Sequence, residues 1–168
     1  MYRIRFKSVR FGLISFFVLL FQSTLAYSFS LGTIKPDFVL LLVIFFALYK
    51  GQKQGMFYGM VVGIFVDALS GGVVGINSFG LGCVGLLCGL LKERVYINHF
   101  LTKFLVGLAA CLVYSIVYYV LGEQFFRLPG FFANIDIVIG TMVYTSFCNI
   151  FFVDVLDRFV IDRSTSLL

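Results

Sequence analysis

Few side chains in this 168-residue sequence could carry out chemistry, and they are scattered. One carboxylate, Asp67, lies deep within an apolar run, where an acidic group bonds a structural partner, contacts a ligand or is protonated. The single histidine, His99, stands between Asn98 and Phe100 in a basic stretch, which favours a solvated position over the role of a catalytic base. The sequence therefore offers isolated groups and no catalytic set.

Motifs that mark common catalytic sites are absent from the sequence. It has no Gly-x-Ser-x-Gly elbow, no His-Glu-x-x-His zinc helix and no glycine-rich phosphate loop followed by Lys. The four cysteines fall inside apolar runs, which favours small core hydrophobes over disulfides or metal ligands; they are Cys83, Cys88, Cys111 and Cys148. We predict a protein that is not an enzyme and that binds no metal or cofactor.

Glycines recur at every fourth position of the third apolar run, at Gly51, Gly55, Gly59 and Gly63, and Asp67 is next in the series. Four residues advance a helix by about 400°, so the series forms one slowly winding stripe. In lipid, such stripes of small residues let two helix backbones pack closely. The fourth run offers matching faces, Ser78 with Gly82 and Gly85 with Gly89. Two interpretations remain open: packing within one bundle, or a surface for another subunit.

Asp67 needs a partner because an ionised carboxylate at membrane depth costs on the order of 2.5 to 3.5 kcal/mol. The nearest candidates in the sequence are the backbone amides of Ser70, Gly71 and Gly72, where the helix is expected to end. A structural cap is one interpretation, and contact with a partner or ligand is the other.

The composition is that of a membrane protein. Hydrophobic residues make up 61% and charged residues 12% of the chain, whereas a soluble domain has about half and about a quarter. We predict a single integral membrane domain, residues 1–168, folded as an all-α bundle of six transmembrane helices. The expected spans are about residues 11–29, 36–49, 54–69, 78–91, 104–121 and 135–153.

The second and third spans are short, about 21 and 24 Å long against a hydrocarbon core of about 30 Å. They must thin the bilayer, pack inside the bundle or enter only part way. At the start of the second span, Pro36 suits a first-turn position and Asp37 complements the positive end of the helix dipole.

The basic residues predict the orientation of the chain. With six crossings and a cytoplasmic N-terminus, all of the 13 Lys and Arg except Lys35 and Arg127 lie inside, as the positive-inside rule requires. Both termini are then cytoplasmic. The basic residues are spread between apolar runs, which argues against nucleic acid as a partner. Residues 154–168 interleave charged and apolar residues, so they form either a cytoplasmic amphipathic tail or the end of the sixth helix.

Two short elements resemble a known family. Ile34-Lys35-Pro36-Asp37 opens a short Leu- and Phe-rich helix, and the glycine-spaced helix ends in Asp67-Ala68-Leu69-Ser70-Gly71-Gly72, with Gly75 beyond. On these elements the sequence resembles the rod shape-determining protein MreD family over nearly its whole length. The candidate packing or partner-interface residues are therefore Pro36, Asp37, Gly55, Gly59, Gly63, Asp67, Ser70, Gly71, Gly72 and Gly75.

The resemblance implies a non-enzymatic scaffold of the cell-wall elongation complex in the bacterial inner membrane. It implies direct binding of MreC and work with MreB filaments, RodA and a class B penicillin-binding protein. The family is similar in fold to the substrate-binding subunits of energy-coupling-factor vitamin transporters, so a substrate-capture subunit is the alternative. Such a subunit needs an outward pocket with several polar groups, for which the candidates are Gln22, Asp67, Ser70, Asn77 and Ser78. A membrane enzyme is a third class, which the short loops disfavour.

Overall fold

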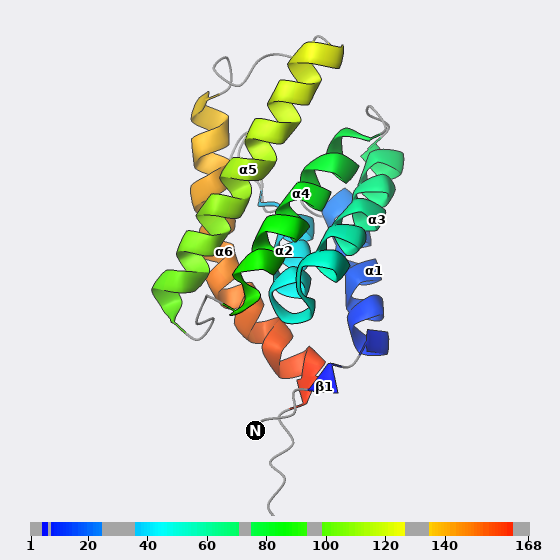
Figure 1. Cartoon of the computed structure of the whole chain (residues 1–168), viewed down its shortest axis with the longest axis vertical. Coiled ribbons are helices and arrows are strands. Elements are labelled where there is room, and N and C mark those ends of the chain that lie inside the picture. The colour runs from blue at the N-terminus through cyan, green and yellow to red at the C-terminus, as the bar shows by residue number, and fades with distance from the viewer. Residues whose placement is uncertain are drawn as a thin grey trace, which may run out of the picture.

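The computed structural model describes residues 5–6, 8–24, 36–70, 75–93, 99–126 and 135–162. Its six α-helices are α1 (Ser8–Thr24), α2 (Phe38–Lys50), α3 (Gln52–Ser70), α4 (Ile76–Leu90), α5 (Phe100–Phe126) and α6 (Ile135–Val160). A 3-10 turn, η1 (Leu91–Glu93), follows α4, and two short strands, β1 (Arg5–Phe6) and β2 (Ile161–Asp162), pair with each other. The expected all-α architecture with six helices is confirmed, apart from this strand pair (Figure 1).

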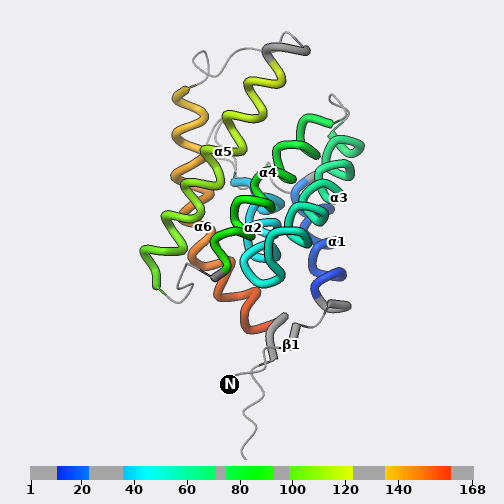
Figure 2. The backbone as a smooth tube through the Cα atoms, viewed as in Figure 1, coloured from blue at the N-terminus to red at the C-terminus, as the bar shows by residue number. Residues whose placement is uncertain are grey.

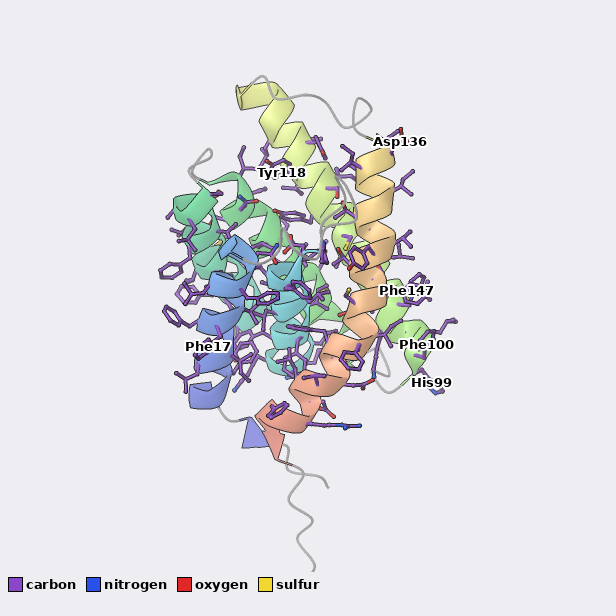
Figure 3. The ribbon with its side chains drawn as sticks, turned by 180° about the vertical axis from the view of Figure 1, so that it is seen from behind. Phe17, His99, Phe100, Tyr118, Asp136 and Phe147 are labelled. Atoms are coloured by element: carbon purple, nitrogen blue, oxygen red, sulfur yellow. The ribbon has the colours of Figure 1, made fainter. Side chains whose placement is uncertain are left out.

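The outer surface of the described part is apolar. Large hydrophobic side chains are exposed on α1, α3, α5 and α6, including Phe57 at 70% and Phe147 at 61%. Figure 3 shows Phe17, Phe100 and Phe147 pointing away from the bundle. A soluble protein rarely exposes so much apolar surface, whereas lipid favours it. Two helical segments, Phe100–Gly122 and Ile135–Phe159, are long and apolar enough to cross a membrane.

Helix α2 lies at the centre and contacts the other five helices (Figures 1 and 2). Its residues from Val39 to Phe45 are all buried, and five of them, 41–45, have no exposed surface. A helix that is apolar all round needs neighbours on every side. Of the three alternatives for a short second span, the structure therefore shows packing inside the bundle for α2.

The start of α2 differs in one detail from the expectation. The helix begins at Phe38, so Pro36 precedes the first turn and does not belong to it. Asp37 is the N-cap, and its carboxylate accepts a hydrogen bond from the backbone N–H of Leu40 at 3.0 Å. An acidic side chain in this position accepts a hydrogen bond from a backbone N–H that has no acceptor within the helix. The helix therefore starts at Phe38, two residues later than it would with Pro36 as its first residue.

The two ends of the described chain lie together. Strand β1 precedes α1, β2 follows α6, and the two pair antiparallel with Arg5 opposite Asp162. Helix α6 continues without a break past Val153 to Val160, so this part of the expected tail is the end of the sixth helix. The next two residues of the tail, Ile161 and Asp162, form β2. Residues 163–168 of the tail and residues 25–29 of the expected first span lie outside the described residues.

Candidate functional site

Helices α3 and α4 run side by side in opposite directions, and glycines bring their backbones into contact (Figure 1). A Cβ added to Gly59 would lie 2.3 Å from the carbonyl oxygen of Leu81, and one added to Gly63 would lie 2.3 Å from the Cα of Ser78. At the next step of the stripe, a Cβ on Gly55 would lie 2.7 Å from the carbonyl oxygen of Gly85. These distances leave no room for a side chain, so the spacing of the helices depends on glycine.

The seam between α3 and α4 also uses glycines of α4. A Cβ on Gly85 would lie 2.2 Å from the carbonyl oxygen of Gly55, and one on Gly89 would lie 2.4 Å from the Cα of Gln52. Gly55, Gly59 and Gly63 are buried. At these glycines the stripe is therefore covered by α4 of the same chain.

Asp67 ends the glycine stripe, and its carboxylate organises the start of α4. The side chain is 1% exposed. One oxygen accepts from the backbone N–H of Gly75 at 2.8 Å and of Ser78 at 3.3 Å, and the other from the side-chain amide of Asn77 at 2.8 Å and its backbone N–H at 3.3 Å. The first backbone N–H groups of a helix have no acceptor within the helix and carry partial positive charge, so a buried carboxylate is stabilised there.

These partners differ from the expected ones. The amides that bind Asp67 belong to the first turn of α4 and the residue before it, because α4 returns antiparallel and points its N-terminus at the end of α3. Ser70 is exposed, and its hydroxyl donates to the backbone carbonyl oxygen of Asp67 at 3.3 Å. Gly75 has a φ of 109°, which favours glycine. Gly71 and Gly72 lie outside the described residues.

The Asp67 cluster extends to α5 and borders a cavity. The hydroxyl of Tyr114 donates to the side-chain oxygen of Asn77, which links α4 to α5. Both residues line a cavity of about 720 Å³ at this end of the bundle, together with Gln22, Asp37 and Thr145. The backbone N–H of Asp37 donates to the Thr145 hydroxyl at 3.3 Å, and the Gln22 side-chain oxygen accepts from the N–H of Phe38 at 3.2 Å. Several polar groups around the cavity therefore already hold helices together.

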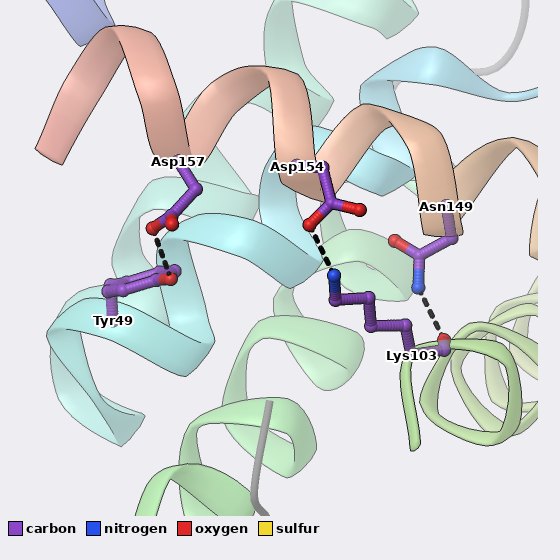
Figure 4. A network of polar contacts seen from close by, with 5 residues as sticks. All are labelled: Tyr49, Lys103, Asn149, Asp154 and Asp157. Atoms are coloured by element: carbon purple, nitrogen blue, oxygen red, sulfur yellow. Dashed lines mark hydrogen bonds and ion pairs between the residues drawn. The ribbon is translucent and has the colours of Figure 1, made fainter. Parts of the chain in front are cut away.

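A second polar network lies toward the other end, between α6 and its neighbours (Figure 4). The hydroxyl of Tyr49 at the end of α2 donates to Asp157 at 2.7 Å, and Lys103 of α5 forms an ion pair with Asp154. The side-chain amide of Asn149 donates to the backbone carbonyl oxygen of Lys103 at 2.6 Å. These contacts fasten α6 to α2 and α5.

Sequence reasoning missed the buried polar residues of α6. Thr145, Ser146 and Asn149 are each at most 1% exposed. Thr145 and Asn149 are four residues apart within an apolar run, so they share one helix face. That spacing is the signal that marks this face as the inner one, because polar groups in a membrane span face protein.

Among the described residues, no group of three or more His, Cys, Asp or Glu side chains is placed to hold a metal ion. His99 is exposed just before α5. Figure 3 shows His99 and Asp136 near opposite ends of the bundle. The polar side chains that the helices bring together bind backbone groups and one another, which is the chemistry of helix connection.

Comparison with known proteins identifies the family. The family model of the rod shape-determining protein MreD matches residues 4–161. The Rod shape-determining protein MreD of Bacillus subtilis (strain 168) is 29% identical over 89 residues, which are 53% of this chain and 50% of that protein. The match thus spans about half the length of the curated relative. No solved structure matches the chain, so the expected similarity to transporter subunits gains no support. Because the family match runs through all six helices, the chain belongs to the rod shape-determining protein MreD family.

Proposed function

We propose that this protein is a non-enzymatic membrane scaffold of the bacterial rod-shape complex. The observation that carries the proposal is the family match over residues 4–161, which includes the glycine seam and the Asp67 cluster. A role in rod-shape determination follows from membership of the family. The scaffold role is supported by the side chains themselves, because the buried polar groups of the described residues connect helices.

In the proposed arrangement the chain crosses the inner membrane six times, with both termini in the cytoplasm. The distribution of basic residues supports this orientation, since only Lys35 and Arg127 fall on the outer side. The pairing of β1 with β2 supports an even number of crossings, because it holds the first and last described segments at the same end.

MreC is the direct partner in this proposal, and MreB, RodA and a class B penicillin-binding protein belong to the wider complex. Helices α1, α5 and α6 expose large apolar side chains along their lengths, which suits contact with membrane helices as well as with lipid. The end that carries both termini would face the filament side, and the end with the Asp67 cluster would face the side of wall synthesis.

Co-purification from native membranes tests the scaffold proposal. MreC should be recovered with the tagged chain in a fixed ratio, and a tagged multi-pass membrane protein of unrelated function should not recover it. Depletion of the chain should disturb cell shape and wall insertion while leaving vitamin uptake unchanged. Recovery of a small molecule bound with nanomolar affinity, without MreC, would contradict the scaffold and favour a capture subunit.

A further inference from the structure

A basic hollow of about 480 Å³ lies where α2 passes into α3, beside the end of α4. Three lysines line it: Lys50 from the last turn of α2, Lys53 from the first turn of α3 and Lys92 from η1. None of the described residues that line this hollow is acidic. We call it the lysine hollow. It lies at the end of the bundle opposite the Asp67 cluster.

Backbone contacts shape the lysine hollow. Gly51 has a φ of 94° and joins α2 to α3, and a Cβ on it would lie 3.4 Å from Cδ and 3.7 Å from Nζ of Lys92. The ammonium group of Lys92 therefore lies over the turn. Gly89 lets α4 approach the backbone of Gln52, which fixes the start of α3 against α4. The lysines are thus mounted on closely packed backbone.

The start of α3 adds to the positive charge. Gly51 has no side chain with which to cap the helix, and the first backbone N–H groups of any α-helix lack acceptors within it. The partial positive charge of a helix N-terminus therefore adds to that of the ammonium groups of Lys53 and Lys92. Such a combination favours a phosphate group over a neutral ligand.

An apolar groove of about 370 Å³ adjoins the lysine hollow and shares Lys53 and Gln54 with it. Its other walls are Phe46 of α2 and Phe57, Tyr58 and Val61 of α3. Lys53, Phe57 and Val61 are spaced four residues apart, so the groove follows one face of α3 away from the lysines. A charged hollow that continues into an apolar groove matches a ligand with an anionic head and a hydrocarbon chain.

We propose that this composite site binds one anionic phospholipid, with its phosphate in the lysine hollow and an acyl chain along the groove. The inference rests on the proposed function only in that it places the chain in a bilayer. The lysine end is the end that the proposed topology puts in the cytoplasm, where basic pockets beside a bilayer attract anionic headgroups.

The test uses the purified full-length chain, without partners, and measures lipid binding by native mass spectrometry. The probes are phosphatidylglycerol, phosphatidylcholine with the same acyl chains, and inorganic phosphate. We expect one tightly bound phosphatidylglycerol, with weaker binding of the other two probes. The double variant Lys53→Gln/Lys92→Gln removes two of the three lysines. It should weaken the binding of phosphatidylglycerol roughly 30-fold, since each basic residue near an anionic lipid contributes about five-fold to the affinity. The matched control is Arg158→Gln, an exposed basic residue of α6 that does not line the hollow.

The groove is tested separately. Val61→Trp narrows the groove and should weaken the binding of long-chain phosphatidylglycerol more than that of a short-chain form. Ile64→Trp, at an exposed position outside the groove, should leave the binding of both lipids unchanged.

Rising salt should weaken the binding of phosphatidylglycerol to the parent chain and leave the binding of phosphatidylcholine unchanged. Equal loss in the lysine and Arg158→Gln variants, or inorganic phosphate binding as tightly as the lipid, would overturn the proposal. Because MreC is absent, a chain that recovers MreC from membranes but does not select phosphatidylglycerol would refute this site alone.

Discussion

At the scale of single residues, Asp67 combines almost complete burial with several accepted hydrogen bonds. Its buried carboxylate accepts four hydrogen bonds from Gly75, Asn77 and Ser78. Asn77 in turn accepts a hydrogen bond from the hydroxyl of Tyr114. The burial cost of the charge is therefore offset by donors that α4 would otherwise leave unsatisfied. One side chain couples the end of α3, the start of α4 and the middle of α5.

Asp67→Ala should lower the free energy of unfolding by about 3 kcal/mol, because it removes a charged acceptor and leaves buried N–H groups unpaired. Asp67→Asn should cost less, since its amide oxygen still accepts. The measurement is thermal or denaturant unfolding in detergent, followed by circular dichroism. Asp136→Asn is the control, because Asp136 is exposed in the first turn of α6 and its loss should cost less than about 1 kcal/mol. Equal stability of Asp67→Ala and the parent would contradict the capping role.

At the scale of elements, α3 and α4 form one unit because their backbones touch along the glycine seam. Each turn of α3 from Gly55 to Gly63 meets backbone atoms of α4. In lipid, where burial of apolar surface no longer drives association, such close approach gains dispersion contacts and weak Cα–H···O bonds. Phe57, Ile64 and Phe65 are exposed on α3 away from this seam, so we expect their replacement to leave the seam intact.

Gly59→Ala should destabilise the fold by about 1 to 3 kcal/mol, because its Cβ would lie 2.3 Å from a backbone oxygen of α4 and the two helices must separate. The same substitution at Gly12 of α1 should be neutral or stabilising, since a Cβ there meets nothing within 4 Å and alanine favours a helix. Unfolding midpoints of the two variants in one detergent make the comparison. If Gly59→Ala is as stable as Gly12→Ala, the close contact does not determine the packing of the two helices.

At the scale of the whole molecule, the arrangement is a central helix with five others around it. Because residues 39–45 of α2 are buried, most of the surface offered to lipid or partners comes from the other helices. The paired strands close the bundle by joining the first and last described segments. The polar contacts of α6 with Tyr49 and Lys103 fasten the same end.

The proposed topology predicts which positions can be labelled from each side of the membrane. A cysteine in place of Lys53 should react with a membrane-impermeant thiol reagent only after the membrane is opened, and one in place of Arg127 should react in intact cells. The parent chain provides the background, because its Cys83, Cys88, Cys111 and Cys148 all lie within helices. Labelling of position 53 in intact cells would refute the six-crossing arrangement with cytoplasmic termini.

The sequence by itself determined the features that depend on composition and on local spacing. An apolar content of 61% indicated a membrane protein. Apolar runs separated by basic or glycine-rich segments predicted six helices. The Pro36-Asp37 pair, and Asp67 followed by Ser70-Gly71-Gly72, indicated the family. These features are readable because a helix forms from contacts between residues three and four positions apart, which lie within one stretch of sequence.

Only the tertiary structure decided which helix faces meet. In the structure, α4 of the same chain packs against the glycines of α3. The hydrogen-bond partners of the Asp67 carboxylate lie at the start of α4 and not at the end of α3. The tertiary structure also placed α2 at the centre and brought Lys92 beside the α2–α3 turn, where it completes the lysine hollow. The physical reason is that these contacts join segments distant in sequence. A stripe of glycines permits close approach equally to any smooth helix, so the choice of neighbour depends on the packing of all six helices together.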